Sequence, residues 1–168
     1  MTEPVPILAA EVAPGAAVGE ALLALNNAHA VALSWLEAGR FRRLVRQAHV
    51  ALRIGEAEAL LLGFDPAADY DSPNFLWFRD RLAGFLYVDR VVVAAGARGR
   101  GLGRRLYREV FEAAGRAGLG RVVCEVNADP PNPASDAFHA ALGFTEMGTG
   151  VLDLGRKTVR YLVRPLDP

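Results

Sequence analysis

The stretch Ala97–Gly115, ARGRGLGRRLYREVFEAAG, decides how this chain folds. It follows Phe85–Ala94, an apolar run with the length and composition of a buried strand. From Leu102 onward, apolar residues recur every three to four positions, which predicts a helix that begins at Leu102 or Gly103. Residues 98–103 are therefore a turn between a strand and a helix, and this turn is rich in glycine and arginine.

Such a turn predicts an anion site. The first backbone N–H groups of a helix have no partner inside the helix and lie at the positive end of its dipole. Glycine lets an anion approach the backbone closely, and the arginines add positive charge. The spacing excludes a Walker A loop, because no Lys-Ser or Lys-Thr follows, and it does not fit the dinucleotide-binding pattern of glycines. At this point a strand-to-helix turn with solubilising arginines remains an alternative.

Length and composition indicate one domain over residues 1–168. The apolar fraction is 52% and 19 basic residues balance 19 acidic ones, so no overall charge favours a nucleic-acid or membrane partner. Glu3 stands where a signal peptide carries positive charge, and no apolar run has the length of a membrane helix. A cytoplasmic protein is the prediction. A single cysteine and three histidines without metal spacing predict no disulfide and no metal site.

Helical and strand-like segments alternate along the rest of the chain. We expect strands at Pro4–Val12, His49–Ile54, Ala57–Phe64, Phe85–Ala94 and Arg121–Asn127, and a final hairpin within Gly148–Leu166. We expect helices at Val18–Leu33, Glu37–Ala48, Leu102 onward and Ser135–Leu142. Asp65–Arg81 is predicted to be a long irregular binding loop.

Two blocks carry a resemblance to a known family. Val93–Gly103 (VAAGARGRGLG) resembles the Arg/Gln-x-x-Gly-x-Gly/Ala signature of the GNAT superfamily of N-acetyltransferases. Asn132–Phe144 resembles the Asn-x-x-Ala-x-x-Phe-Tyr-x-x-Leu-Gly-Phe block of the same superfamily, with Ser135 in place of alanine and His139 in place of tyrosine. Ala95 also stands where the family often has proline. The two blocks occur in order, separated by one helix and one strand, within about Phe85–Gly148.

The resemblance implies a fold and a cosubstrate. The fold is α/β (α+β), the acyl-CoA N-acyltransferase fold: a mixed, mostly antiparallel sheet of about six to seven strands that splays open between its fourth and fifth strands, flanked by about four helices. Acetyl-CoA would lie in the opening, and its diphosphate would be the anion bound by the turn. The backbone of Val91 and Val93 would pair with the pantetheine arm like an added strand.

The cofactor contacts implied by the resemblance fall on both blocks. Backbone amides of the turn would hold the pyrophosphate, and arginines would neutralise it; the residues concerned are Arg98, Gly99, Arg100, Gly101, Leu102, Gly103 and Arg104. Asn132 would touch the pantetheine or a nearby phosphate. Ser135 is a small residue that would let its helix approach the cofactor.

Two residues are candidates for the general acid and two for the general base. The family tyrosine commonly protonates the departing thiolate. His139 can do the same, because an imidazolium of reference pKa about 6.5 is a stronger acid than a thiol of about 8.5. A packing role for His139 remains open, with Tyr87 as the substitute acid. Asp89 and Glu125 each interrupt an apolar strand, and a buried carboxylate has the raised pKa that a base needs, although an ion pair with a neighbouring arginine is the alternative for both.

The sequence therefore predicts an enzyme that transfers an acetyl group from acetyl-CoA to a primary amine of an unidentified small molecule or peptide. Direct attack in a ternary complex is expected, because no activated nucleophile is apparent. A regulatory module that binds acyl-CoA without turnover is one alternative. A nucleic-acid-binding protein is another, and the neutral net charge argues against it. The acceptor and the oligomeric state are not determined by the sequence; homodimers are common among similar proteins.

Overall fold

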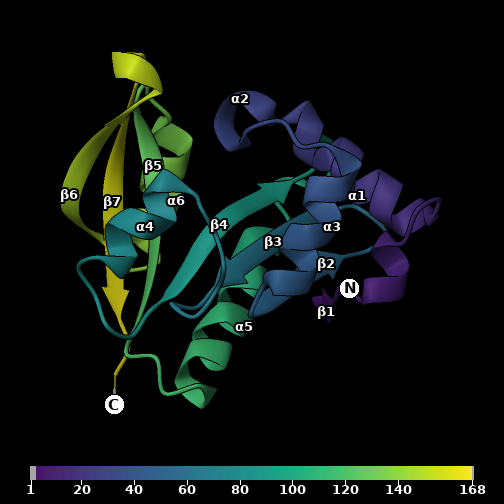
Figure 1. Ribbon diagram of the computed structural model, residues 1–168, viewed down its shortest axis with the longest axis horizontal. Helices are drawn as coiled ribbons and strands as arrows, with labels where there is room; N and C mark the ends of the chain where they lie inside the picture. The colour runs from purple at the N-terminus through teal and green to yellow at the C-terminus, as the bar shows by residue number, and fades with distance from the viewer. Residues whose placement is uncertain (1–2, 168) are drawn as a thin grey trace.

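Seven strands form one mixed sheet in the computed structural model, which describes residues 3–167 (Figure 1). The order across the sheet is β1-β2-β3-β4-β5-β7-β6. The strands are β1 (Val5–Pro6), β2 (Val50–Ile54), β3 (Ala59–Phe64), β4 (Leu86–Val93), β5 (Arg121–Asp129), β6 (Thr145–Leu152) and β7 (Lys157–Pro165). All neighbours are antiparallel except β4 and β5, which run parallel.

The sheet opens between β4 and β5. Their ladder consists of the register pairs Leu86–Val122 and Tyr87–Val123. Beyond Tyr87 the two strands diverge, and Figure 1 shows them meeting at one end and separating toward the other. This confirms the predicted mixed sheet that splays between its fourth and fifth strands.

Helices cover both faces of the sheet, and each face has its own core. The helices are α1 (Ala17–Ala28), α2 (Ala30–Leu33), α3 (Ala38–Gln47), α4 (Pro73–Arg79), α5 (Leu102–Arg116) and α6 (Pro133–Ala141), with short 3-10 turns η1 (Ala9–Val12), η2 (Ala95–Ala97) and η3 (Asp153–Gly155). Buried residues of α1, α3 and α4 share one core, whereas α5 packs into the other with Phe138 of α6 against it. Among residues 3–167, no helix has the length and apolarity to cross a membrane.

The described chain holds six α-helices rather than the predicted four or so, and the extra ones lie near the sheet opening. The segment predicted as an irregular loop contains α4, which begins at Pro73 after Ser72, a sequence typical of a helix start. Phe75 and Phe78, three residues apart, are fully buried on its inner side. The helix predicted over Val18–Leu33 is interrupted at His29, whose backbone is not helical, so α2 is a separate turn.

The predicted first strand, Pro4–Val12, is mostly not a strand. Val5–Pro6 forms a short ladder with β2, the Ile7 N–H donates to the Ala51 carbonyl at 2.9 Å, and Ala9–Val12 forms η1. Glu11 explains the turn, because its carboxylate accepts a hydrogen bond from the Leu8 N–H at 2.9 Å and pairs with Arg53 at 2.6 Å.

A β-bulge in β4 changes which side chains face the opening. Leu62 is opposite Arg90 and Gly63 is opposite Val88, so Asp89 has no partner position on β3. A bulge shifts the alternation of a strand by one residue. Tyr87 and Val92 therefore pack in the same core although they are five positions apart. Asp89 and Arg90 lie close enough on one face to form an ion pair.

Candidate active site

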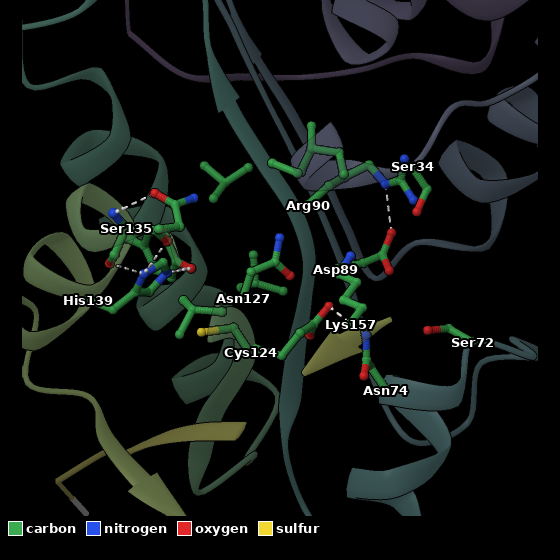
Figure 2. A pocket seen from close by; sticks show the side chains of 18 of the residues that line it. Ser34, Ser72, Asn74, Asp89, Arg90, Cys124, Asn127, Ser135, His139 and Lys157 are labelled. Atoms are coloured by element: carbon green, nitrogen blue, oxygen red, sulfur yellow. Dashed lines mark hydrogen bonds and ion pairs between the residues drawn. The ribbon is translucent and has the colours of Figure 1, made fainter. Parts of the chain in front are cut away.

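Two hollows meet where the sheet opens. A large cleft of about 600 Å³ runs along the end of β4 and the start of α5. A small cavity of about 170 Å³ lies between the diverging parts of β4 and β5 (Figure 2). Six residues line both: Ala32, Leu33, Val91, Asn132, Ser135 and His139. A molecule lying in the large cleft would therefore present one end to the small cavity at these residues.

The large cleft collects nearly every residue that the sequence predicts for the cofactor. Its lining includes Val91, Val93, Arg98, Gly99, Gly101, Leu102, Gly103, Arg104, Asn132 and Ser135. Arg100 is the exception, because its guanidinium pairs with Glu58 at 2.7 Å, on the turn between β2 and β3. The sequence could not show this, since Glu58 is 42 positions away.

The glycines of the turn have two different reasons to be glycine. Gly99 and Gly101 have φ values of +77° and +74°, a left-handed conformation that favours glycine, and a Cβ on either would meet no atom within 4 Å. Their backbone therefore faces open space. Gly103 has an ordinary φ, but a Cβ there would lie 3.0 Å from Cζ of Phe138, so this glycine lets α6 approach α5.

The start of α5 suits an anion. Gly101 is the N-cap, and no side chain caps the first turn, so its leading N–H groups remain available. Arg98 lines the cleft beside them and donates a hydrogen bond to Nε2 of His29 at 3.2 Å. His29 can accept because its Nδ1 donates to the Leu25 carbonyl at 3.0 Å. The turn thus combines free backbone donors with a positioned guanidinium, and this fits a diphosphate.

Asn132 and Ser135 begin α6 at the junction of the two hollows. Asn132 is the N-cap, and its side-chain oxygen accepts a hydrogen bond from the Ser135 N–H at 3.2 Å. Its oxygen is therefore committed to the helix, which leaves the amide NH₂ as the group that can reach a ligand.

Glu125, on β5, is the carboxylate best placed for proton transfer in the small cavity. Its Oε1 accepts hydrogen bonds from Asn74 at 3.0 Å and from the Tyr87 hydroxyl at 3.1 Å. The residue as a whole is only partly buried, yet its Oε2 is shielded from solvent and has no hydrogen-bond partner among the described residues. Burial, with a smaller effect from the negative charge of Asp89, raises the pKa of Glu125 to about 8.

Asp89 is fully engaged. Its Oδ2 pairs with Nε of Arg90 at 2.7 Å, and both side chains are nearly inaccessible to solvent. Its Oδ1 accepts from the hydroxyls of Tyr70 at 2.7 Å and Tyr87 at 3.4 Å. Arg90 in turn donates to Asn26 of α1 at 2.8 Å. The predicted alternative, an ion pair, is the arrangement found, although the arginine comes from the same strand through the bulge.

The two predicted acids, His139 and Tyr87, both have their protons engaged in hydrogen bonds. Nδ1 of His139 lies 2.8 Å from the Ser135 carbonyl, which only accepts, so Nδ1 carries the proton. Nε2 is then the acceptor for the Tyr107 hydroxyl at 2.8 Å, and burial lowers the pKa of His139, which favours this neutral form. Tyr87 is fully buried, donates toward Glu125 and does not line either hollow.

Comparison with known proteins agrees with this arrangement. Residues 67–144 match the model of the acetyltransferase (GNAT) family. This match covers just under half of the 168 residues and shows a resemblance to the family. This segment includes β4, the glycine-rich turn, α5, β5 and α6, which contribute most of the lining of the two hollows.

The chain is similar to two curated proteins over part of their length. It is 42% identical to phosphinothricin N-acetyltransferase of Streptomyces coelicolor over 71 residues, which are 42% of this chain and 40% of that protein. It is 33% identical to a probable glucosamine 6-phosphate N-acetyltransferase 2 of Oryza sativa subsp. japonica over 109 residues, 56% of this chain and 58% of that protein. The chain thus spans about two fifths of the length of the first relative and about three fifths of the length of the second.

Solved structures share the fold of this chain across nearly its whole length. The yncA protein of Salmonella typhimurium, solved with its cofactor acetyl-CoA, has a TM-score of 0.69 at 20% identity, covering 100% of this chain and 95% of that one. A chain of the NatC complex bound to Gag peptide and CoA has a TM-score of 0.74 at 15% identity, covering 99% of each chain. At these identities the likeness establishes the fold.

Three parts of the candidate site were not predicted from the sequence. Tyr107 lies on the buried side of α5 and lines the small cavity, but in the sequence it is one apolar position of a helix. Ala32 and Leu33 of α2 line both hollows and carry no motif. Lys157 lines the small cavity from the start of β7, and in the sequence it is only a charge in a hairpin turn.

Proposed function

We propose that this chain is an acetyl-CoA-dependent N-acetyltransferase that transfers an acetyl group to a primary amine of a small molecule or peptide. One observation carries the proposal: a free helix N-terminus with a positioned arginine opens into a cleft, and the far end of that cleft meets a cavity holding a partly unpaired buried carboxyl. The first feature fits a diphosphate, and the second fits a base for an ammonium group.

In this proposal the residues of the large cleft bind acetyl-CoA. The backbone of Val91 and Val93 lies along the pantetheine arm, and the amides from Arg98 to Gly103 hold the diphosphate with the charges of Arg98 and Arg104. The thioester then lies at the junction beside Val91 and Ser135, where a β4 backbone N–H near Val91 or Val92 can polarise its oxygen. Arg100 belongs to this set only if its pair with Glu58 opens.

The reaction requires the acceptor nitrogen to lose a proton and the sulfur to gain one. Glu125 takes a proton from the ammonium group, directly or through a water, and the free nitrogen pair attacks the carbonyl carbon of the thioester. The carbon–sulfur bond breaks as the carbon–nitrogen bond forms. A covalent enzyme intermediate is not needed, and Cys124 is unsuited to form one because burial raises the pKa of its thiol far above the usual range.

We infer that Tyr107, positioned by His139, supplies the proton to the departing thiolate. Tyr107 lines the small cavity, and its hydroxyl contacts His139. Tyr87 is buried and does not line the cavity. His139 then acts on Tyr107 rather than on the sulfur. This changes the roles expected from the sequence, in which His139 or Tyr87 is the acid.

The test is paired binding and turnover with the Gly101→Glu variant. Its carboxylate would occupy the diphosphate position, so calorimetry should detect no acetyl-CoA binding, and thiol release with an amine panel should cease. Gly118→Glu is the matched control, because Gly118 also has a positive φ of +68° and open space around it but lies at the other end of α5, away from the cleft.

The outcomes separate the candidates. Unchanged acetyl-CoA affinity in Gly101→Glu contradicts the assignment of the turn. Tight acetyl-CoA binding by the unmodified chain without turnover on any amine favours the alternative, a regulatory acyl-CoA-binding module. The cytoplasmic location, the homodimer and the single-domain extent of residues 1–168 remain predictions, which fractionation, ultracentrifugation and limited proteolysis would test.

A further inference from the structure

Lys157 is a cation that lines the proposed acceptor cavity. It is the first residue of β7 and lines the small cavity together with Asp89 and Glu125 (Figure 2). On β7, residues 157, 159 and 161 share one face by alternation. Since Tyr161 is opposite Glu125 and Val159 is opposite Asn127, Lys157 lies beyond Asn127 on the face that carries the base.

The other charges around the cavity cancel or are absent near neutral pH. Asp89 and Arg90 neutralise each other at 2.7 Å. His139 is held in its neutral form by its two hydrogen bonds. Glu125 is mostly protonated below its pKa of about 8. Lys157 has neither an ion pair nor a side-chain hydrogen bond within residues 3–167, so the cavity carries one uncompensated positive charge.

Neutral donors accompany this charge. The side chains of Asn127, Ser34 and Ser72 line the same cavity and make no hydrogen bond within residues 3–167. Amide and hydroxyl groups can donate to an oxyanion, and a cation beside them makes such bonds stronger. The lining therefore suits a carboxylate or a phosphorus oxyanion at one end and an amine at Glu125.

The dimensions restrict the acceptor to a short molecule. The cavity holds about 170 Å³, close to the roughly 150 Å³ of an engineered cavity that binds benzene. Lys157 and Tyr161 are four positions apart, roughly 13 Å along the strand, and the lysine side chain covers part of this distance. The ammonium is near enough to lower the pKa of Glu125 by its charge. Only a few carbon atoms fit between an amine at the base and an oxyanion at Lys157.

We propose that the acceptor is a small primary amine bearing an oxyanion on a short carbon chain, and that Lys157 selects it by binding this oxyanion. The inference rests on the proposed acetyltransferase function and gives its substrate class. Lys157 would bind a carboxylate and a phosphorus oxyanion in the same way, so both are included in the test.

The first experiment measures selectivity. The panel pairs β-alanine and 2-aminoethylphosphonate with β-alaninamide and propylamine, which lack the oxyanion, and adds a tripeptide as a bulky acceptor. The oxyanion acceptors should have the higher kcat/KM. Lys157→Gln should lower their kcat/KM by about 10- to 100-fold, and Lys157→Arg should recover most of it. Arg156→Gln, which removes an exposed charge one position earlier, should keep the selectivity.

The second experiment needs no turnover. Calorimetry measures the binding of 3-hydroxypropanoate, which has the oxyanion but no amine, to the protein saturated with CoA. The Kd should rise about 10- to 100-fold in Lys157→Gln and should stay constant in Arg156→Gln.

The two experiments distinguish the two levels of inference. Turnover of propylamine or the tripeptide at least as efficient as that of the oxyanion acceptors overturns the substrate class while the acetyltransferase function stands. An equal loss of kcat/KM for all acceptors in Lys157→Gln also overturns the substrate class. Binding of 3-hydroxypropanoate that depends on Lys157, with no turnover of any amine, supports the oxyanion site and contradicts the acetyltransferase proposal.

Discussion

At the scale of single residues, Glu125 shows how position in the fold changes the chemistry of a common side chain. Burial and the nearby charge of Asp89 oppose ionisation, whereas hydrogen bonds from Asn74 and Tyr87 to Oε1 favour it. The balance raises the pKa of Glu125 to about 8, and Oε2 remains without a partner among the described residues. A carboxyl of this kind can act as a base near neutral pH, which an exposed glutamate does poorly.

Glu125→Gln tests this role through its pH dependence. A base works in its deprotonated form, so kcat/KM of the unmodified protein should rise with pH to a plateau above about 8. The variant should lose this inflection and at least about 100-fold in rate. The measurement is kcat/KM from pH 6 to 10 for one amine, with Glu112→Gln on the exposed side of α5 as the control. An unchanged profile in Glu125→Gln would contradict the assignment.

The same residue predicts a change in stability with pH. The pKa of Glu125 is higher in the folded chain than its ordinary value of 4.5, so the folded state holds the proton more tightly than the unfolded state. Stability from this residue is therefore complete at low pH and is lost as pH rises from about 4.5 through about 8. The glutamine variant does not ionise, so its Tm relative to the unmodified protein should increase between pH 6 and pH 9. A constant Tm difference by calorimetry would refute this.

At the scale of elements, α5 and α6 form one unit. Gly103 leaves room for Phe138, and the Tyr107 hydroxyl donates to His139 across the same contact. The rings of Tyr107 and Phe144 also meet edge to face, with centroids 5.7 Å apart. The turn proposed to bind the diphosphate and the hydroxyl proposed to protonate the sulfur are thus fixed to each other.

Tyr107→Phe tests the catalytic part of this unit. Removal of the hydroxyl should lower kcat by about 10-fold or more and leave the Kd of acetyl-CoA within about twofold, because the aromatic packing is kept. Tyr87→Phe is the contrast, since its hydroxyl faces Glu125. The Tyr87→Phe variant should alter the pH dependence of kcat/KM more than it alters the protonation of the sulfur. Unaltered kcat in Tyr107→Phe would return the acid to Tyr87 or to water.

At the scale of the whole molecule, the proposed cosubstrate site lies at the one parallel pair of strands in the described sheet, where the ladder is short. β4 and β5 share two register pairs, whereas β5 and β7 pair along the length of β5. The two halves are otherwise connected by contacts such as the stacking of Trp77 of α4 on Tyr161 of β7, with ring centroids 4.0 Å apart. A ligand between the diverging strands contacts both halves.

Acetyl-CoA should therefore stabilise the folded chain. Ligand at 100 times its Kd contributes about 2.7 kcal/mol, which corresponds to a rise in Tm of roughly 5 to 10 °C for a chain of this size. Thermal unfolding at several acetyl-CoA concentrations measures it, and free acetate is the control. A Tm independent of acetyl-CoA concentration would contradict binding in the gap.

Local patterns in the sequence determined much of this protein. Apolar periodicity located α5 and β4, and the resemblance of two motifs to a known family predicted the splayed sheet and most of the cleft lining, because these features depend on residues close together in the chain. The glycines at 99 and 101 could be interpreted in the same way, since their backbone conformation is local. The start signal of α4, Ser72-Pro73, was also present in the sequence but was outweighed by the polar residues before it.

Only the tertiary structure decided the chemistry around the motifs. The bulge at Asp89 depends on the register with β3, and it is what turns Asp89 toward Arg90. The pairing of Arg100 with Glu58 joins residues 42 positions apart, and the contact of Tyr107 with His139 joins residues 32 positions apart. Lys157 lines the cavity without an ion pair or side-chain hydrogen bond within residues 3–167. Burial, charge and hydrogen bonding act through space, so the sequence determined the fold and the proposed cosubstrate cleft, whereas folding decided which groups are free to react.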